Sequence, residues 1–453
     1  MDVIVIETPQ LGDRSYLVHD GEVAVAIDVQ RDIDRVQAAA RQAGVRITHV
    51  AETHMHNDYV TGGLELARAE GAVYLVNGAD PVQFDREPVT DGDERAVGGL
   101  SLKVVATPGH TDTHVSYLLT HGQQQAVFSG GSLLYGSVGR TDLVDPAMTE
   151  ELTHAQYASV RRLANEADRD AELYPTHGFG SFCSSGPASG AGSSTLAEQL
   201  TSNHALTDAD EDRFVRELIA NLTAYPSYYA HMGPANLKGP GAVDLSVPEP
   251  LDPDELARRL HDGEWVVDLR SRVAFADKHL SGAVSFEYGN GSMFTTFLGW
   301  VLPWGDRLSL VGPEDDVRNA IRDLSRIGID SPDAALGEDP TTLAPDVAAA
   351  GYPRVDWAGM LAQRAQQDTV LDVRRRDEYQ ADHVRGSLNI PLHELVGRVD
   401  EVPGGKIWVH CGSGYRASIA SSLLQRAGRN VVHVDAMFGD AAASGVDLVG
   451  AAT

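Results

Sequence analysis

Cysteine is scarce in this 453-residue chain, which contains only Cys183 and Cys411. Two thiols far apart in the sequence do not form the disulfide framework of a secreted domain, so we expect a reducing, cytoplasmic setting. Long apolar runs are also lacking, and no stretch approaches about 18 unbroken apolar residues, so we predict no membrane span. The N-terminal residues MDVIVIETPQ lack the basic and apolar segments of a signal peptide.

Positive charge is in short supply as well. The 36 Lys and Arg residues against 65 Asp and Glu residues give a formal net charge of −29 and a pI near 4.8. Such an acidic surface repels phosphate backbones and anionic lipid, so nucleic acid and membrane surfaces are not expected as partners. Apolar residues make up 42% of the chain and charged residues 22%, which is an ordinary globular composition.

Two Pro/Gly-rich stretches divide the chain, at 233–253 and 330–353. At roughly 150 residues per domain the length fits about three domains, and we predict them over 1–235, 250–335 and 353–453. The first alternates short β-like runs with polar turns and a few helical windows, including a helix over roughly 32–43. Each of the others contains a strand, a helical stretch and a further strand, which predicts small α/β domains.

The two later domains share a spaced motif. His279 and Gly282 lie 11 and 14 residues after Asp268, and His383 and Gly386 lie at the same distances after Asp372. An Asp-x-Arg sequence, a histidine and a glycine at matched spacings indicate an internal duplication of about 100 residues.

The segment KIWVHCGSGYRASIASSLLQRAG predicts a strand over 407–410, a glycine-containing turn over 411–416 and an amphipathic helix over 418–427. A thiol between a strand end and a helix start faces free backbone N–H groups and the positive end of the helix dipole. Both stabilise a thiolate, so Cys411 is a predicted nucleophile, and Arg416 adds a cation at the rim. A buried, inert cysteine is the alternative.

This turn resembles the loop of rhodanese sulfurtransferases, in which six residues run from the catalytic Cys to a closing Arg. The resemblance implies a persulfide on Cys411 and a closing role for Arg416. The residues that would cradle the sulfur are Gly412, Ser413, Gly414 and Tyr415. Related Cys phosphatases have a loop one residue longer, so the loop length favours sulfane sulfur over phosphate. The first copy has no cysteine, and we expect it to be a structural or docking domain.

Histidines follow β-like runs in the first domain. ETHMHND places His54, His56 and Asp58 at alternate positions, a spacing that can aim two imidazoles at one point. TPGHTDTH adds His110 and YPTHGFG adds His177, each in a Gly- or Thr-rich turn. A single histidine is more often a surface or core group than a ligand, but four in this setting favour a metal site.

These segments resemble the metallo-β-lactamase fold, an αββα sandwich with a metal cleft at one edge of its sheets. The stretches GSLLYGSVGRTDLV (131–144) and THGFGSFCSS (176–185) are most similar to persulfide dioxygenases, which oxidise glutathione persulfide to sulfite. The resemblance implies mononuclear Fe(II), with zinc, or no metal, as the alternatives. It covers essentially the whole chain, because bacterial fusions of such a dioxygenase with two rhodanese domains are known.

Two positions depart from the family pattern. Tyr59 stands where the His-x-His-x-Asp-His motif has its last histidine, which argues against a second metal and against binuclear hydrolase chemistry. Gly131 stands where the family has an aspartate, which completes the iron centre with the residues matching His54 and His110. The predicted iron triad therefore lacks its carboxylate.

Further residues are candidates on weaker grounds. His56 or Asp142 is the hypothetical replacement ligand. Arg140 is a candidate for binding a substrate carboxylate, with a structural salt bridge as the alternative. Cys183 lies six residues after His177, and it is either a sulfur-handling group near the cleft or a bystander thiol.

The resemblances together predict oxidation of a low-molecular-weight thiol persulfide to sulfite, coupled to thiosulfate:thiol sulfur transfer through Cys411. One alternative is a sulfurtransferase with a degenerate, non-oxidising first domain. Others are a glyoxalase II-type thioester hydrolase and a sulfur-binding or redox-sensing protein without turnover. We expect small thiols, persulfides and thiosulfate as binding partners. We also expect a homodimer, because sandwich folds with exposed sheet edges often dimerise.

Overall fold

The computed structural model of the protein describes residues 1–186, 190, 192–289, 291 and 293–450. The chain divides into two compact units. The first comprises Met1–Val243 with Ser325–Gly328, and the second comprises Asp244–Leu324 and the chain from Ile329 onward. The second unit thus holds both later domains, and the boundaries expected from the sequence stay predictions.

The first unit contains two six-stranded sheets. The first sheet runs in chain order and consists of β1 (Asp2–Thr8), β2 (Asp13–His19), β3 (Val23–Ile27), β4 (Arg46–Ala51), β5 (Val73–Asn77) and β6 (Glu87–Val89). The second has the order β12-β11-β10-β9-β8-β7 and consists of β7 (Glu94–Val97), β8 (Leu100–Ala106), β9 (Val115–His121), β10 (Gln124–Gly130), β11 (Glu172–Pro175) and β12 (Ser194–Thr195).

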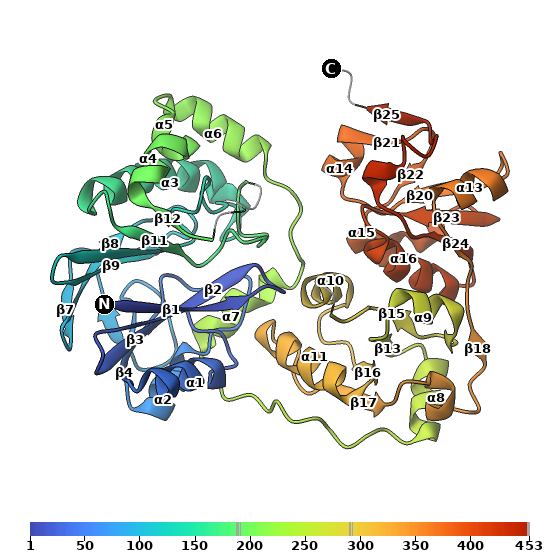
Figure 1. Ribbon diagram of the computed structural model, residues 1–453, viewed down its shortest axis with the longest axis horizontal. Coiled ribbons are helices and arrows are strands. Elements are labelled where there is room, and N and C mark those ends of the chain that lie inside the picture. The colour runs from blue at the N-terminus through green and yellow to red at the C-terminus, as the bar shows by residue number, and fades with distance from the viewer. Residues whose placement is uncertain (187–189, 191, 290, 292, 451–453) are drawn as a thin grey trace. The chain divides into compact units, whose positions relative to one another are not determined.

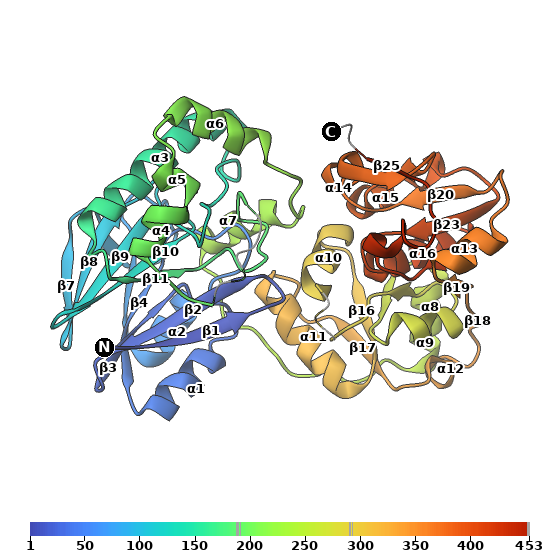
Figure 2. The same cartoon turned by 45° about the horizontal axis from the view of Figure 1, so that its top comes forward.

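Helices cover the outer face of each sheet (Figures 1 and 2). Those on the first sheet are α1 (Asp34–Ala43) and α2 (Gly63–Glu70). Those on the second are α3 (Thr149–Glu166), which follows the short η1 (Pro146–Met148), and α4 (Leu196–Ser202), α5 (His204–Thr207) and α6 (Glu211–Ala220). A further helix, α7 (Tyr229–Lys238), ends the unit. The predicted αββα sandwich is confirmed.

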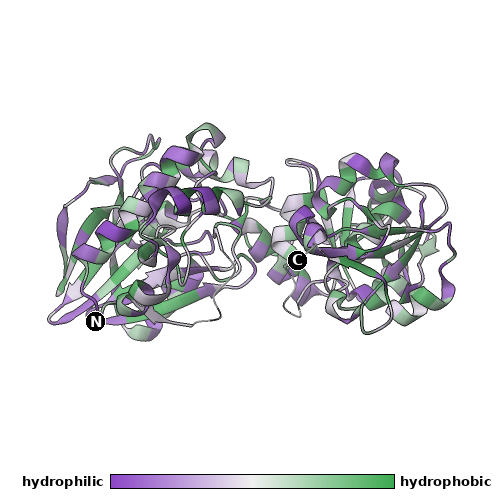
Figure 3. Cartoon of the chain, turned by 90° about the horizontal axis from the view of Figure 1, so that it is seen from above, coloured by the Kyte–Doolittle hydropathy of each residue, from purple (hydrophilic) through white to green (hydrophobic). Residues whose placement is uncertain are grey.

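The alternation of side chains along the strands produces these layers. On β2, Tyr16 and Val18 point into the core between the sheets, whereas Leu17 packs in the core beneath the helices. Successive side chains of a strand point to opposite faces, so a strand with apolar residues at every position is buried on both sides. Figure 3 shows hydrophobic colour along the strands and hydrophilic colour on many of the helices around them.

The second unit contains two parallel sheets, one for each copy of the duplicated motif. The first has the order β15-β13-β16-β17, with β13 (Trp265–Asp268), β15 (Val284–Ser285), β16 (Leu308–Gly312) and β17 (Asp333–Leu336). The second has the order β19-β24-β23-β20-β22, with β19 (Arg354–Val355), β20 (Thr369–Asp372), β22 (Leu388–Asn389), β23 (Lys406–His410) and β24 (Asn430–Val434). Two small antiparallel pairs are added, β14 (His279–Leu280) with β18 (Ala349–Ala350), and β21 (Asp382–Val384) with β25 (Leu448–Gly450).

Helices connect these strands. In the first copy they are α8 (Pro253–His261), α9 (Arg272–Asp277), α10 (Phe294–Val301), α11 (Glu314–Arg326) and α12 (Pro340–Leu343). In the second copy they are α13 (Trp357–Gln363), α14 (Arg376–Ala381), α15 (Leu392–Arg398), η2 (Val399–Glu401), α16 (Tyr415–Arg426) and η3 (Phe438–Asp440). Among the helices of the described residues, none combines the length and apolarity that a membrane crossing needs.

The duplicated residues make the same local contacts in both copies. Asp268 ends β13 and Asp372 ends β20, and each carboxylate pairs with the arginine two residues later, at 2.6 and 2.8 Å. In His279 and His383, Nδ1 lies 2.6 and 2.9 Å from the backbone oxygen of the residue four positions earlier. Each imidazole also stacks on the aromatic ring of that earlier residue. These matched contacts support the internal duplication.

The helix after Cys411 begins earlier than predicted. The sequence pattern places it at 418–427, whereas α16 begins at Tyr415. Gly414 precedes it with a φ of 88°, a left-handed conformation that glycine adopts at little cost, and its carbonyl accepts a hydrogen bond from the Ser418 N–H at 2.9 Å. Tyr415 and Arg416 therefore belong to the first helical turn. The helix predicted near residue 32 begins at Asp34.

We predict that Leu75→Ala destabilises the first unit by about 2–5 kcal/mol, because Leu75 is fully buried between the sheets and its removal leaves a cavity. The free energy of unfolding, measured by denaturant titration, checks this prediction. The matched control is Val73→Ala on the same strand, where the side chain is 41% exposed. If the two variants lost the same free energy of unfolding, the assignment of Leu75 to the core would be wrong.

Candidate functional sites

The histidines of the first unit follow the C-terminal ends of strands. His54 and His56 come after β4, His110 comes after β8 and His177 after β11. The strands belong to both sheets, so the turns meet at one edge of the sandwich. All four imidazoles are buried, with at most 1% exposed. The strand arrangement thus brings together residues that are up to 123 positions apart in the sequence.

Three of these imidazoles face one another. A ligand nitrogen of His54, one of His110 and one of His177 all lie within 4.8 Å of one another, and the Nε2 atoms of His54 and His177 are 3.4 Å apart. The Nε2 atom of His110 is buried and has no hydrogen-bond partner. A buried nitrogen without a partner is costly unless a proton or a metal is bound nearby.

In two of the three rings, the other nitrogen lies beside an oxygen that can only accept. Nδ1 of His110 lies 2.7 Å from the backbone oxygen of Arg140, so this nitrogen donates. Nδ1 of His177 lies 2.9 Å from a carboxylate oxygen of Asp13 and 3.2 Å from one of Asp58. Because Nδ1 carries a proton in both rings, Nε2 is the nitrogen that each ring turns inward, and on the neutral His110 ring it holds a lone pair.

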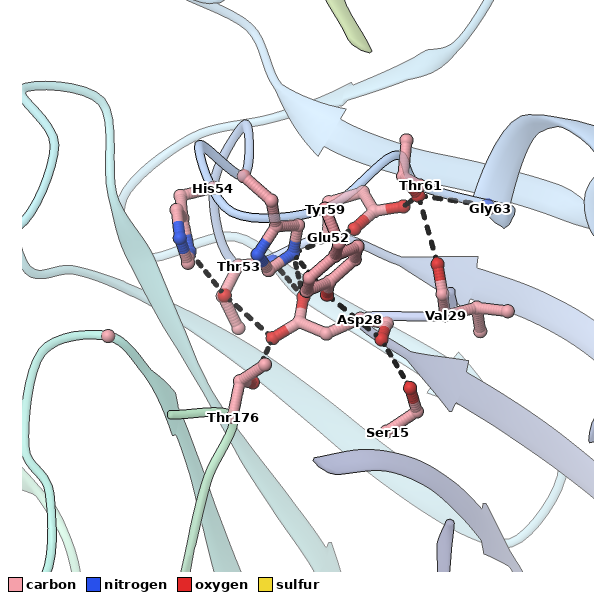
Figure 4. A network of polar contacts seen from close by, with 12 residues as sticks. Ser15, Asp28, Val29, Glu52, Thr53, His54, Tyr59, Thr61, Gly63 and Thr176 are labelled. Atoms are coloured by element: carbon pink, nitrogen blue, oxygen red, sulfur yellow. Dashed lines mark hydrogen bonds and ion pairs between the residues drawn. The ribbon is translucent and has the colours of Figure 1, made fainter. Parts of the chain in front are cut away.

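The third ring is oriented through a hydroxyl group. Thr53 donates its proton to Asp28 at 2.8 Å, so its oxygen is left to accept from Nδ1 of His54 at 2.9 Å. Figure 4 shows Thr53 between His54 and Asp28. The Nε2 atom of His54 therefore also carries a lone pair. The three inward nitrogens form a donor set that fits Zn²⁺, Fe²⁺ or Co²⁺.

The surroundings shift the pKa values of these histidines in opposite directions. Burial lowers the pKa of the His177 imidazole, but the carboxylates of Asp58 and Asp13 outweigh it and raise that pKa well above its ordinary value. Burial and the neighbouring imidazoles lower the pKa of His54 well below its ordinary value. Burial also lowers the pKa of His110 to about 3. His54 and His110 are therefore neutral at pH 7, the form in which an imidazole binds a metal.

His56 faces a different set of groups. Its Nε2 lies 3.3 Å from Asp28, 3.2 Å from Glu52 and 2.9 Å from the hydroxyl of Tyr59. Burial lowers its pKa, but the two carboxylates outweigh that effect and raise it to about 9. Figure 4 shows the network around Asp28 and Glu52, to which Thr61 and Thr176 also donate. The remaining nitrogen of His56 has no hydrogen-bond partner. His56 also forms a second close group of possible ligands with Asp58 and His177.

The second candidate site is the turn that begins at Cys411. This buried residue follows β23, and only Gly412, Ser413 and Gly414 separate it from α16. A Cβ atom at position 414 would overlap a carboxylate oxygen of Asp435, so glycine is required there for space as well as for backbone conformation. The first N–H groups of α16 have no partners within the helix and can bind an anion at the turn.

Arg416 is fixed beside this turn by a carboxylate. Its two terminal nitrogens donate to the two oxygens of Glu378 on α14, at 2.6 and 2.8 Å. Burial raises the pKa of the Glu378 carboxyl, but the hydrogen bonds and the charge of Arg416 outweigh burial and lower it to about 2. The paired guanidinium cannot swing away from the loop without breaking two charge-assisted hydrogen bonds.

The first copy contributes aromatic surface next to the loop. The ring of Phe297 on α10 lies 5.9 Å from the ring of Tyr415, and the Arg416 guanidinium lies 6.0 Å from the same phenyl ring. Trp300, one turn later on α10, stacks on His393 of α15 at 4.4 Å. This packing is consistent with the docking role expected for the first copy.

No thiol occupies the equivalent position of the first copy. Val311 pairs with Asp268 as His410 pairs with Asp372, so Gly312 corresponds in position to Cys411. Pro313 follows it, where the second copy has the glycine-containing turn. The first copy therefore has neither the sulfur nor the loop that sulfur transfer requires.

Comparisons with known proteins match these two regions. A family model described as the metallo-beta-lactamase superfamily matches residues 13–178, and a model described as a rhodanese-like domain matches residues 356–437. The human mitochondrial persulfide dioxygenase ETHE1 is 29% identical over 238 residues, which cover 52% of this chain and 81% of that protein. A hydroxyacylglutathione hydrolase from Rhizobium johnstonii is 35% identical over 121 residues, which cover 26% of this chain and 46% of that protein.

A solved structure is also similar to this chain. A metallo-beta-lactamase from Staphylococcus aureus subsp. aureus COL superimposes with a TM-score of 0.66 and 27% identity, covering 74% of this chain and 99% of that chain. The chain joins a metallo-β-lactamase domain to a rhodanese-like domain. The similarity to persulfide dioxygenases and the rhodanese-like match support an enzyme with dioxygenase and sulfurtransferase features. The rhodanese-like assignment of 250–335 stays a prediction, because the family match lies within 356–437.

Within the metallo-β-lactamase domain, the structure places Arg140 and Asp142 against each other. Two nitrogens of the guanidinium bind the two oxygens of Asp142 at 2.7 and 2.8 Å, and the remaining nitrogen donates to the backbone of Phe182 at 3.1 Å. The Arg140 side chain is 2% exposed. This geometry supports the salt-bridge interpretation, and among the described residues Asp142 belongs to none of the close groups of possible metal ligands. The roles of both residues toward substrate or metal stay predictions.

Cys183 lies in the same domain and is completely buried. Burial and the carboxylates of Asp58 and Asp13 raise the pKa of its thiol well above the ordinary value. Asp58 and Tyr229 are among the polar side chains that act on this thiol. A neutral thiol in these surroundings is a poor nucleophile. It lies beside Asp58, and both the sulfur-handling role near the cleft and the bystander thiol stay predictions.

Sequence reasoning missed the groups that orient the histidines. Asp28 ends up at the centre of the network with a φ of 52°, a strained conformation for a non-glycine residue, and its carboxylate accepts from the Thr53 N–H at 2.7 Å. His114 accepts from the Gly131 N–H at 3.0 Å. The available signals were a buried aspartate directly after a strand and the second histidine of TPGHTDTH.

We predict that the Glu378–Arg416 pair makes the rhodanese-like domain sensitive to acid. Because the folded pKa of Glu378, about 2, lies below the ordinary value of 4.5, the stabilisation is complete above pH 4.5 and is lost as pH falls toward 2. We expect Glu378→Gln to flatten the pH dependence of unfolding over that range by about 1–2 kcal/mol, since the pair is partly solvated.

Denaturant titrations at several pH values between 2 and 6 measure this effect. The matched control is Asp440→Asn, which removes an exposed carboxylate from the same domain and should retain the pH dependence of the parent. An identical pH dependence in Glu378→Gln and the parent would contradict the assigned coupling.

Proposed function

We propose that this enzyme oxidises a low-molecular-weight thiol persulfide, such as glutathione persulfide, to sulfite at a mononuclear Fe(II) centre, and transfers sulfur between thiosulfate and a thiol through a persulfide on Cys411. The observation that carries the proposal is the convergence of three buried imidazole nitrogens in a domain similar to persulfide dioxygenases. The rhodanese-like turn on the same chain handles the same kind of sulfur.

The protein's part in the oxidation is to hold and orient the donor nitrogens. When bound, an iron(II) ion supplies open positions for O₂ and for a sulfur ligand. The Arg140 carbonyl, Thr53 and the Asp13–Asp58 carboxylates fix the ring orientation of His110, His54 and His177. Burial of all three rings keeps bulk water away from them.

The overall oxidation balances without a further reductant. A thiol persulfide, O₂ and water give the thiol, sulfite and two protons. The outer sulfur loses four electrons and O₂ accepts them. One molecule of O₂ is therefore consumed for each sulfite formed.

Sulfur transfer proceeds by two displacements at sulfur. The Cys411 thiolate attacks the outer sulfur of thiosulfate, the S–S bond of thiosulfate breaks, and its electron pair leaves with sulfite. A thiol acceptor, as its thiolate, then takes the outer sulfur from the Cys411 persulfide and restores the Cys411 thiolate. The N-terminus of α16 and the fixed Arg416 guanidinium provide positive charge where the anions meet.

A second candidate for the metallo-β-lactamase domain is thioester hydrolysis. The observation that favours it is the 35% identity to a hydroxyacylglutathione hydrolase. Hydrolysis of S-lactoylglutathione, followed by the loss of thioester absorbance, distinguishes this activity. The homodimer and the cytoplasmic location expected from the sequence stay predictions.

We predict that the iron-loaded protein consumes O₂ and releases sulfite in a ratio of one when glutathione persulfide is added. An oxygen electrode and a sulfite assay measure the ratio, and protein with the metal removed by a chelator is the control. Oxygen uptake equal to that of the control would remove the oxidase half and leave a sulfurtransferase with a degenerate first domain.

We also predict that Cys411→Ser lowers sulfur transfer from thiosulfate at least 100-fold, because a hydroxyl cannot carry the persulfide. Protein labelled from thiosulfate that is radioactive in its outer sulfur, isolated after rapid desalting, measures the loaded fraction. The matched control is Cys183→Ser, which removes the other thiol and should retain labelling. Labelled Cys411→Ser protein would contradict the assignment.

A further inference from the structure

We propose that the metal of this chain is held by three imidazoles, those of His54, His110 and His177, and that Gly131 belongs to the site because it makes room for one of them. This inference rests on the proposed metal-dependent function and specifies its ligand set. The set differs from the two histidines and one carboxylate that the family resemblance implies.

The space beside Gly131 is the first reason. A Cβ atom at this position would overlap the His110 ring, lying 2.6 Å from Cγ and 2.7 Å from Nε2. The backbone of Gly131 is not in the left-handed region, so its conformation does not demand glycine. The missing side chain is therefore required for room. The His110 imidazole occupies the space that the side chain of an aspartate at position 131 would need.

A second glycine, Gly139, also lies against the His110 ring. A Cβ atom at Gly139 would lie 2.7 Å from Nδ1 of His110, and the Gly139 N–H donates to the backbone oxygen of Gly131 at 3.0 Å. His110 thus lies between two backbone segments that are held together by a hydrogen bond. The ring cannot move aside for a larger residue without breaking this contact or the one to the Arg140 carbonyl.

Two carboxylates beside His177 supply the negative charge that position 131 lacks. Asp13 and Asp58, both buried, face the outer nitrogen of that ring at 2.9 and 3.2 Å. A carboxylate that accepts from a ligand imidazole makes the imidazole a stronger donor and adds negative charge to the site. The third imidazole therefore replaces the carboxylate as ligand, and the carboxylates act through it.

The other close groups of this domain fit a metal less well. In the group of Asp28, Glu52 and His56, the carboxylates already accept hydrogen bonds from threonine and tyrosine hydroxyls. In the group of His56, Asp58 and His177, the Asp58 carboxylate already pairs with the proton-bearing nitrogen of His177. Neither group uses the unpartnered Nε2 of His110.

Cobalt(II) titration of the metal-free full-length protein tests the ligand set without relying on turnover. We expect His177→Ala and His110→Ala each to weaken Co(II) binding at least 10-fold. The matched control is His154→Ala, a partly exposed histidine of the same domain, which should bind like the parent. Visible absorbance of bound Co(II) and elemental analysis after gel filtration measure binding, and circular dichroism confirms that each variant is folded.

Gly131→Asp discriminates between the two ligand sets most sharply. A site that merely lost its carboxylate would bind Co(II) more tightly when the carboxylate is restored. In the three-histidine site the new side chain displaces His110, so we expect Gly131→Asp and Gly131→Ala both to bind at least 10-fold more weakly. Tighter binding by Gly131→Asp would overturn the proposal.

X-ray absorption of the zinc-loaded parent gives a test that needs no variant. Multiple scattering from three imidazoles for each zinc is expected, and two imidazoles with a carboxylate would overturn the inference. Metal binding through three histidines without oxygen uptake would remove the proposed oxidase function but leave this inference intact. Oxygen uptake together with a two-histidine spectrum would support the oxidase function and overturn the three-histidine ligand set. If the parent protein bound no metal, both the oxidase function and the ligand set would be wrong.

Discussion

Three buried imidazoles lie together in this protein only because the outer nitrogen of each ring donates to an oxygen. A backbone carbonyl, a threonine hydroxyl and a pair of carboxylates supply those oxygens. Each acceptor places a proton on the outer nitrogen, so the inward nitrogen is the one that offers a lone pair when the ring is neutral. Such a cluster is unfavourable in a low-dielectric interior unless a cation or a proton is shared among the inward nitrogens. The turns after β4, β8 and β11 depend on this arrangement.

The same constraint separates His54 from His56, although the two are only two residues apart. Their side chains meet different oxygens: His54 meets a hydroxyl whose proton is already engaged, whereas His56 meets the carboxylates of Asp28 and Glu52. The first imidazole is left neutral and available as a ligand, and the second is held as a cation in an ion-pair network. Identical side chains on one short segment thus have opposite electrostatic roles.

Features encoded by local patterns could be predicted from the sequence, whereas features set by distant contacts could not. The resemblance of the histidine-containing segments to the metallo-β-lactamase fold predicted the sandwich, and the spacing of Asp, His and Gly predicted the duplication. The orientation of His177 depends on Asp13, 164 residues away, and no local pattern signals that contact. The start of α16 at Tyr415 likewise depends on Gly414 fitting against Asp435. For the same reason, the room that His110 takes beside Gly131 is invisible without the fold.

The two cysteines of this chain have neighbours of opposite charge, and this difference suits them to different roles in sulfur chemistry. Cys183 is enclosed by Asp58 and Asp13, whose negative charge and burial keep it a thiol. Cys411 lies instead at the N-terminus of α16, beside a guanidinium that Glu378 holds in place. A negatively charged donor such as thiosulfate is repelled from the first environment and attracted to the second. Burial is common to both thiols, so the sign of the neighbouring charge, rather than exposure, decides which one is suited to carry sulfur.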